Sequence, residues 1–265
     1  MKFGSCLLCV PCAVMALCCY TGCRNGAPWT DDGSVSFEFS APFASELNSE
    51  GVEVAEIQVG AGFLKIIGEE NRHKISLEGT KAADSEATLN EISIVSLATA
   101  ATAIITVDGP ESSDKRYKVD LTLFVPRPMA LKVSDTSGSI EISGIRGNIA
   151  IKDGSGGIQI KNTEGNVDID DGSGSIQLAD LKGDDLRVTD GSGSISLLNA
   201  SCSVAQIEDG SGSITVNGMQ GNLTISDGSG SIDVRTVQGN VTVTRAGSGD
   251  VDITDVTGTV KTPRD

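Results

Sequence analysis

The tetrapeptide Asp-Gly-Ser-Gly recurs through the second half of the chain at intervals of 18 or 19 residues. A fixed period of this length is typical of proteins built from stacked copies of one supersecondary unit. The first copy is degenerate (Asp-Thr-Ser-Gly), and the last begins with alanine instead of aspartate. The seven copies begin at Asp135, Asp153, Asp171, Asp190, Asp209, Asp227 and Ala246.

Within each copy apolar and polar residues alternate, which indicates β-strands with one buried face. Five apolar slots recur per copy, with few exceptions such as Thr163, Ala200 and Ala205. One copy alone cannot bury five such residues, but copies stacked ~4.8 Å apart can bury them against each other. The sequence therefore predicts an all-β fold: a β-helix-like β-solenoid of about seven rungs of 18–19 residues.

The remaining chain divides by its regularity. We expect the regular solenoid repeats over residues 135–265, and irregular, β-rich opening rungs that cap the column over residues 46–134. Glycine and Asn or Asp pairs such as Gly165-Asn166 predict a second turn in each rung. One short helix is expected in the cap, beginning at Asp84 as its N-cap and ending near Glu91.

The N-terminus has the features of a secretory signal. Lys2 precedes a mostly apolar run, and six of the seven cysteines lie at or before Cys23. The segment before Cys23 resembles a bacterial lipobox, although Tyr20 stands where leucine is usual. We therefore expect a signal peptide over 1–22, a lipid on Cys23, and a lipidated N-terminus and flexible tether over 23–45.

Lipidation would make the membrane a partner through an N-terminal anchor. It would place the protein extracytoplasmically in a bacterial cell envelope. No aspartate follows Cys23 directly, a pattern that implies the outer membrane if the organism is Gram-negative.

Charge and residue use restrict the chemistry. The net charge of −16 disfavours nucleic acid as a partner and favours a monomer. His73 is the single histidine, and Cys202 is the only cysteine after Cys23. The Gly-Ser-rich runs match neither a phosphate-binding loop nor a serine nucleophile elbow. We therefore expect no catalytic residues, no metal and no cofactor.

The recurring aspartates are the sharpest candidate site. Stacking should align Asp135, Asp153, Asp171, Asp190, Asp209 and Asp227 at one corner of the rungs. Neighbouring carboxylates ~4.8 Å apart would repel by roughly 0.9 kcal/mol in water, and a bond to the local backbone recovers roughly 0.5–1.5 kcal/mol. Because these terms are comparable, we interpret the column as a structural turn ladder. Calcium binding is the alternative, but calcium-binding β-rolls have a nine-residue period with aspartate after the glycines.

Residues Tyr117–Pro126, Leu131–Val133 and Ser137–Ile142, with the repeated rungs, resemble a bacterial family of unknown function labelled as adhesins. This is the head type of GIN auto-transporter adhesins, and the likeness covers roughly residues 50–262. The resemblance implies a β-helix-like fold and an extracytoplasmic location, and it carries no catalytic residues.

The expected function is a non-enzymatic, membrane-anchored lipoprotein that serves as an adhesin-like scaffold or binding surface for a protein or a cell-surface glycan. An envelope-signalling or stress accessory that binds another protein is the alternative. A polysaccharide-active β-helix enzyme is a third class, which would require clustered carboxylates in a cleft.

Overall fold

The computed structural model describes residues 36–263, so the expected signal peptide and Cys23 lie outside the described residues. These residues form one sheet of nineteen strands and a single helix. The elements are β1 (Phe39–Asn48), β2 (Val54–Gln58), β3 (Gly62–Glu69), β4 (Lys74–Ala83), α1 (Glu86–Glu91), β5 (Ser93–Ala98), β6 (Thr102–Asp108), β7 (Tyr117–Pro126), β8 (Ala130–Asp135), β9 (Gly138–Ser143), β10 (Ile149–Asp153), β11 (Gly156–Glu164), β12 (Val167–Asp171), β13 (Gly174–Asp190), β14 (Gly193–Asp209), β15 (Gly212–Asp227), β16 (Ile232–Gln238), β17 (Val241–Arg245), β18 (Val251–Val256) and β19 (Val260–Lys261).

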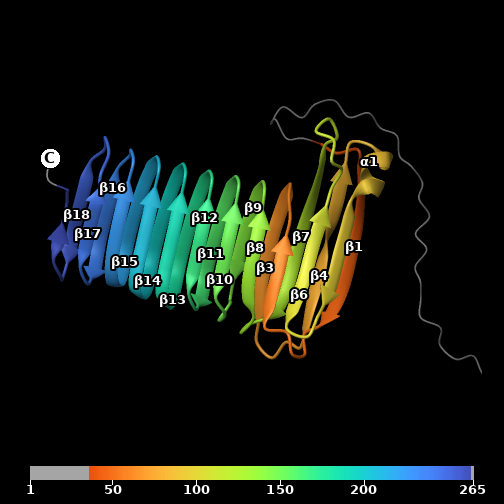
Figure 1. The fold of residues 1–265 in the computed structure, drawn as a ribbon, viewed down its shortest axis with the longest axis horizontal. Helices are drawn as coiled ribbons and strands as arrows, with labels where there is room; N and C mark the ends of the chain where they lie inside the picture. Colours follow the sequence, from red (N-terminus) through yellow and green to blue (C-terminus); the bar gives the residue numbers. More distant parts are fainter. Residues whose placement is uncertain (1–35, 264–265) are drawn as a thin grey trace, which may run out of the picture. The chain divides into compact units, whose positions relative to one another are not determined.

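The predicted β-solenoid is confirmed, with one rung for each copy of the sequence motif (Figure 1). From β8 onward each rung pairs in parallel with the next one in the sequence. One face consists of β9, β11, the first halves of β13, β14 and β15, and then β16 and β18. The opposite face consists of β8, β10, β12, the second halves of the same three long strands, and then β17 and β19.

The apolar slots fill the interior of the column. Ile160 and Val234 are fully buried, and the small exceptions Thr163, Ala200 and Ala205 are at most 2% exposed. Burying one such valine or isoleucine contributes about 1.5–3 kcal/mol, so the repeated slots are the main favourable term that holds the rungs together. At the C-terminal end of the described residues no further rung covers the last one, and Val260 is 43% exposed.

Each rung bends at three places. Two are the predicted turns, at Asp-Gly-Ser-Gly and at the Gly-Asn corner. The third lies a few residues before the Gly-Asn corner, where one residue per rung adopts a left-handed backbone. Asn162, for example, has φ 54°. Glycine, asparagine and aspartate tolerate this conformation best. The positions are Gly144, Asn162, Asp180, Asn199, Gly218, Thr236 and Asp255.

The Gly-Asn corner is a ladder of side-chain hydrogen bonds between rungs. The backbone N–H of Asn166 donates to Oδ1 of Asn148 at 2.9 Å, and the N–H of Asn240 donates to Oδ1 of Asn222 at 3.1 Å. Each asparagine therefore caps the next rung rather than only its own turn. Cys202 stands where this corner has glycine, and the strand register shifts across it, between Ser201 and Val204. The corner is therefore locally rebuilt in this rung.

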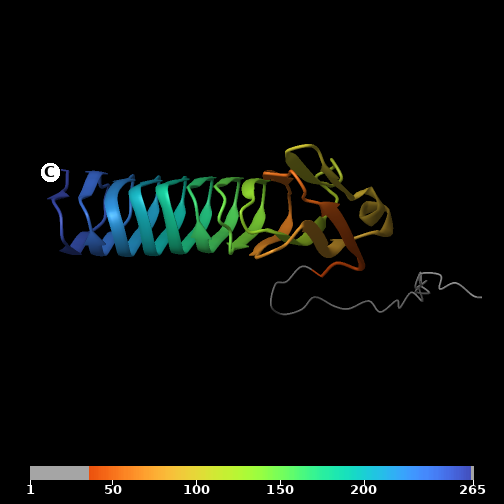
Figure 2. The same ribbon diagram turned by 90° about the horizontal axis from the view of Figure 1, so that it is seen from below.

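The opening rungs do not stack in sequence order, which sequence reasoning did not foresee. The rung made by β2 and β3 lies between two later rungs: β2 pairs with both β6 and β8, and β3 pairs with both β7 and β9. The rung of β2 and β3 thus forms the middle of three. The rung of β6 and β7 lies on its N-terminal side in the column, and the rung of β8 and β9 lies on the side of the regular repeats (Figure 2).

Antiparallel strands finish the N-terminal end of the column. β4 pairs with β7, β1 pairs with β4, and β5 pairs with β6. Two expectations are wrong here. The tether cannot extend to residue 45, because residues 39–48 form β1 with an alternately half-buried face. The helix cap is Ser85 instead of Asp84, since Oγ of Ser85 accepts the Thr88 N–H at 3.1 Å.

Candidate functional site

The six recurring aspartates form one column in the structure. Their registers are direct: Asp153 lies opposite Asp135 and Asp171, and the series continues through Asp190, Asp209 and Asp227. Each aspartate ends a strand at the corner where the chain turns into the next rung. All six are buried, with exposures from 0% to 7%, so the column lies inside the turn and is not a solvated rim.

Each aspartate caps its own turn. In all six copies that begin with aspartate, Oδ1 accepts the backbone N–H of the serine two residues later, at 3.0–3.3 Å. This is an Asx turn, in which the side chain replaces a backbone acceptor. The second glycine of the motif is equally constrained: Gly156 has φ 140°, and a Cβ there would lie 1.5 Å from the carbonyl oxygen of Gly138. The tetrapeptide is thus explained by backbone geometry.

The second carboxylate oxygen has no such role. Oδ2 is buried without a hydrogen-bond partner in Asp153, Asp171, Asp190, Asp209 and Asp227. Burial, and then the neighbouring carboxylates, raise the pKa of Asp153, Asp171 and Asp209 to about 6. Burial also raises the pKa of Asp135 and Asp190. At neutral pH these carboxylates are therefore ionised in an environment that disfavours their charge.

The other chemically distinctive side chains do not join this ladder. His73 is exposed in the turn between β3 and β4, and Cys202 is buried in β14, where burial raises the pKa of its thiol. Within residues 36–263 no three His, Cys, Asp or Glu side chains are grouped so that they could hold a metal ion.

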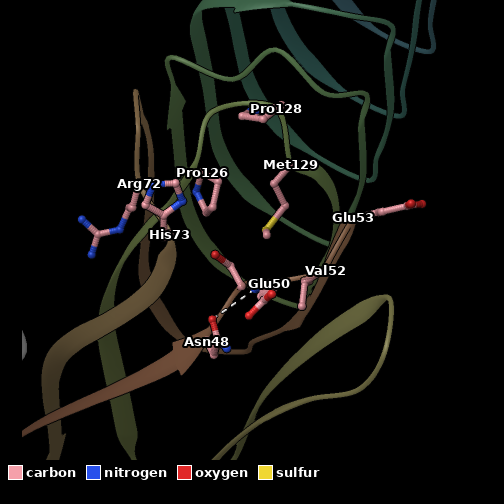
Figure 3. A pocket seen from close by; sticks show the side chains of 10 residues that line it. Asn48, Glu50, Val52, Glu53, Arg72, His73, Pro126, Pro128 and Met129 are labelled. Carbon is pink, nitrogen blue, oxygen red and sulfur yellow. Dashed lines mark hydrogen bonds between the residues drawn. The ribbon is translucent and has the colours of Figure 1, made fainter.

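A pocket of about 610 Å³ lies where three turns meet near the N-terminal end of the column (Figure 3). Met129 and His73 point toward its interior, whereas the Arg72 guanidinium points away. Arg72 is held there by Glu69 at 2.5 Å and by the carbonyl oxygen of Lys74 at 2.8 Å. The pocket is lined by Asn48, Ser49, Glu50, Val52, Glu53, Arg72, His73, Pro126, Pro128 and Met129.

One outward face of the column is hollowed. Two overlapping hollows of about 490 and 450 Å³ lie on the face that contains β8, β10 and β12. They share the small side chain of Ala150 as part of their lining, with Lys132, Asp168 and Arg187 around it. The sequence analysis missed this depression, which appears because Ala150 stands in an outward row of longer side chains such as Asp168 and Arg187.

No helix in residues 36–263 is long and apolar enough to cross a bilayer. The family model described as Toastrack DUF4097 matches residues 66–258. No curated protein matches the sequence.

Among solved structures, a "putative adhesin" from Parabacteroides distasonis is similar over 84% of this chain and 97% of its own, with 14% identity and a TM-score of 0.51. A "putative adhesin" from Parabacteroides merdae has 13% identity and a TM-score of 0.45, over 84% of this chain and 96% of its own. A "putative lipid binding protein" from Parabacteroides distasonis has 14% identity and a TM-score of 0.46, over 84% and 97%. At these identities the likeness concerns the fold.

Proposed function

Because the chain belongs to the toastrack family DUF4097, we propose that it is a non-enzymatic binding scaffold of the bacterial cell envelope. The observation that carries this proposal is the column itself. Every rung except the last buries its apolar slots and aligns its backbone with the next, so the outward side chains form fixed rows on long, continuous faces. Such a surface suits an extended protein or a cell-surface glycan better than a small substrate.

The absence of an enzyme role is part of this proposal. The one recurring carboxylate group in the described residues is buried in turns and shares no cleft with a basic partner. A glycosidase or lyase would need opposed carboxylates that reach a bound sugar. The ladder instead supplies turn caps, which a structural role requires in every rung.

Membrane attachment through a lipid on Cys23 completes the proposal. It is supported by the apolar N-terminal run and by the small residue Gly22 before Cys23. The anchor would hold the column extracytoplasmically, at the outer membrane if the organism is Gram-negative. A tether shorter than expected would precede β1, because that strand begins at Phe39.

Fractionation of cells that express the wild-type chain and Cys23→Ser tests the anchor. We expect the wild type in the membrane fraction with incorporated radiolabelled palmitate, and the variant released or left as an unprocessed precursor. A variant that is processed and still membrane-bound would contradict lipidation.

Crosslinking in intact envelopes, with the anchor retained, tests the binding surface. Ala150→Gln places a longer side chain in the hollow, whereas Thr224→Gln changes the same outward row farther along the column. Loss of a crosslinked glycan or surface protein only in Ala150→Gln would support the adhesin-like scaffold. Specific capture of a membrane signalling protein would instead favour the envelope-signalling accessory. Turnover of a polysaccharide by the purified chain would refute the non-enzymatic role.

A further inference from the structure

The hairpin of β5 and β6 contains an unusually neutral stretch of the chain. Residues 92–107 carry no charged side chain, although 21% of all residues are charged. Val95 and Leu97 on β5 are 43% and 41% exposed, and they lie beside Thr106 and Ile104 of β6. An exposed apolar strand of this kind marks an interaction site or an aggregation hazard.

The outer edge of β5 is unpaired among the described residues, since β5 pairs with β6 alone. The Thr99 N–H donates to the Thr102 carbonyl at 2.8 Å, which makes these two a hydrogen-bonded pair. In antiparallel strands such pairs alternate with non-bonded ones. Ile94, Ser96 and Ala98 therefore direct their N–H and C=O groups to the free edge.

The other free edges of the sheet are protected and this one is not. β1 contains Pro42, which lacks an N–H, and Glu46, which pairs with Lys74 at 2.7 Å. The C-terminal edge contains Asp252, Asp255 and Lys261. Proline and charged side chains are the usual means of blocking edge-to-edge pairing. β5 has neither.

The two layers also end unequally. Beyond β6 and β7, one layer gains β4 and β1, whereas the other gains only β5. The inward side chains Phe39, Phe43 and Leu47 of β1 are only partly buried against the core. The layer that contains β5 is thus one strand shorter than the layer it faces.

We infer that β5 is a docking edge that accepts one extended, uncharged strand of a partner protein by β-strand addition. The strand pairs antiparallel with Ile94, Ser96 and Ala98 through backbone hydrogen bonds, and apolar side chains at alternate positions contact Val95 and Leu97. A second copy of this chain fits less well. If its β5 paired with this β5, its own strands β1 and β4 would take the space beyond β4 that β1 of the first copy already occupies. The inference names a site separate from the outward rows of the column and does not depend on the lipid anchor.

A peptide with the sequence of residues 92–99 is a suitable probe. In antiparallel register centred on Ser96, its leucine lies opposite Val95 and its valine opposite Leu97. The matched control peptide carries N-methyl groups at the positions of Ile94 and Ser96, so it keeps the side chains and loses the donors that pairing needs. Amide hydrogen exchange of the full chain is read by NMR with millimolar peptide.

We expect exchange at Ile94, Ser96 and Ala98 to slow at least about tenfold with the probe and not with the N-methylated control. Leu97→Glu should abolish this protection. The matched variant Leu198→Glu, at a leucine that is 44% exposed on the regular column, should retain it.

Three results would overturn the inference. The first is no protection at millimolar probe, and the second is equal protection by the N-methylated control. The third is protection of these amides in the chain without peptide, which would mean that the chain's own N-terminal segment or a second copy already covers β5; light scattering distinguishes these two. None of these results affects the test of Cys23, so failure of the docking edge is distinguishable from failure of the proposed function.

Discussion

The regular rungs and the crossover rungs hold their neighbours by different means. In the regular column successive rungs are 18 or 19 residues apart, and they are held together by close glycine contacts and asparagine caps. At the crossover, where β2 and β3 pair with β8 and β9, ion pairs join residues that are 57 or 76 positions apart in the sequence. Lys65 pairs with Glu141 at 3.1 Å, Lys132 with Glu56 at 3.0 Å, and Arg127 with Glu70 at 2.7 Å.

The difference reflects how each neighbour is selected. Closing a connection of 76 residues instead of 18 costs about 1.3 kcal/mol more in chain entropy. A backbone ladder alone would pair as readily with the wrong rung, since all rungs have similar geometry. Charge complementarity across β3–β9 and β2–β8 favours the correct partner. Between rungs that are consecutive in the sequence, small residues and backbone bonds predominate, and ion pairs such as Lys161 with Glu141 and Arg187 with Glu208 are sparser.

The largest effect is expected where backbone geometry locks the column. Gly156→Ala places a Cβ against the carbonyl of Gly138 at a φ of 140°, which should lower the free energy of unfolding by more than about 4 kcal/mol or prevent folding. The adjacent Gly157→Ser is the control, because a Cβ there meets nothing closer than 3.7 Å. In urea titrations this control should change the free energy of unfolding by less than about 0.5 kcal/mol. Equal losses of unfolding free energy in the two variants would show that the close contact at Gly156 does not hold the rungs together.

The left-handed bend offers a gain in stability. Thr236 is β-branched and exposed, yet it has φ 57°, a conformation that costs about 1–3 kcal/mol. Thr236→Asn supplies the residue that positions 162 and 199 already carry, and it should raise the free energy of unfolding by about 1 kcal/mol. Thr215→Asn, on an exposed strand position, should lower it slightly. A destabilised Thr236→Asn would refute strain at this bend.

The buried ladder should make the column more stable in mild acid. The pKa of Asp171 in the folded chain is about 6, above its ordinary value of 3.8, so the folded state binds this proton more tightly than the unfolded state. The resulting stability is complete below about pH 4 and is lost as the pH rises through about 6. We expect Tm to fall by a few degrees from pH 5 to pH 7.5.

Asp171→Asn retains the Oδ1 acceptor of the turn and removes the titration. It should make Tm less dependent on pH in that interval and raise it at pH 7.5. Lys152→Gln, an outward residue of the same column, is the control and should leave the pH dependence unchanged. A Tm that rises from pH 5 to pH 7.5 in the wild type would contradict the buried, raised carboxylates.

Much of the column could be predicted from the sequence because its causes are local. The motif period, the alternating slots and the turn residues act within one rung and repeat in the next. The bend at Asn162 also had a signal, since glycine, asparagine or aspartate fills that slot in six of seven rungs, but its varied identity concealed it. β1 was missed because Pro42 and its alanines are poor strand formers, and its pairing with β4 overrides that preference. The crossover and the pocket arise from segments far apart in sequence, which no local pattern reveals.

The smallest effect is expected at the crossover. Glu141 links two rungs at once: Oε2 accepts from Lys65 at 3.1 Å and Oε1 from Lys161 at 3.0 Å. These bonds, with Lys161 first, lower the pKa of Glu141. Because both ion pairs of Glu141 lie near the surface, Glu141→Gln should lower the free energy of unfolding by at most about 1 kcal/mol at low salt, and by less at high salt.

Gln159→Ala is the control, since Gln159 occupies the same outward row on the next rung and forms no ion pair. Its small cost should not depend on salt. If charge at Glu141 selects the neighbour of β3, Glu141→Gln should also slow refolding at low salt, when the long connection must find its partner, while unfolding changes little. A loss that appears only in the unfolding rate would mean that the ion pairs form after the rungs have already paired, and that charge stabilises the crossover without specifying it.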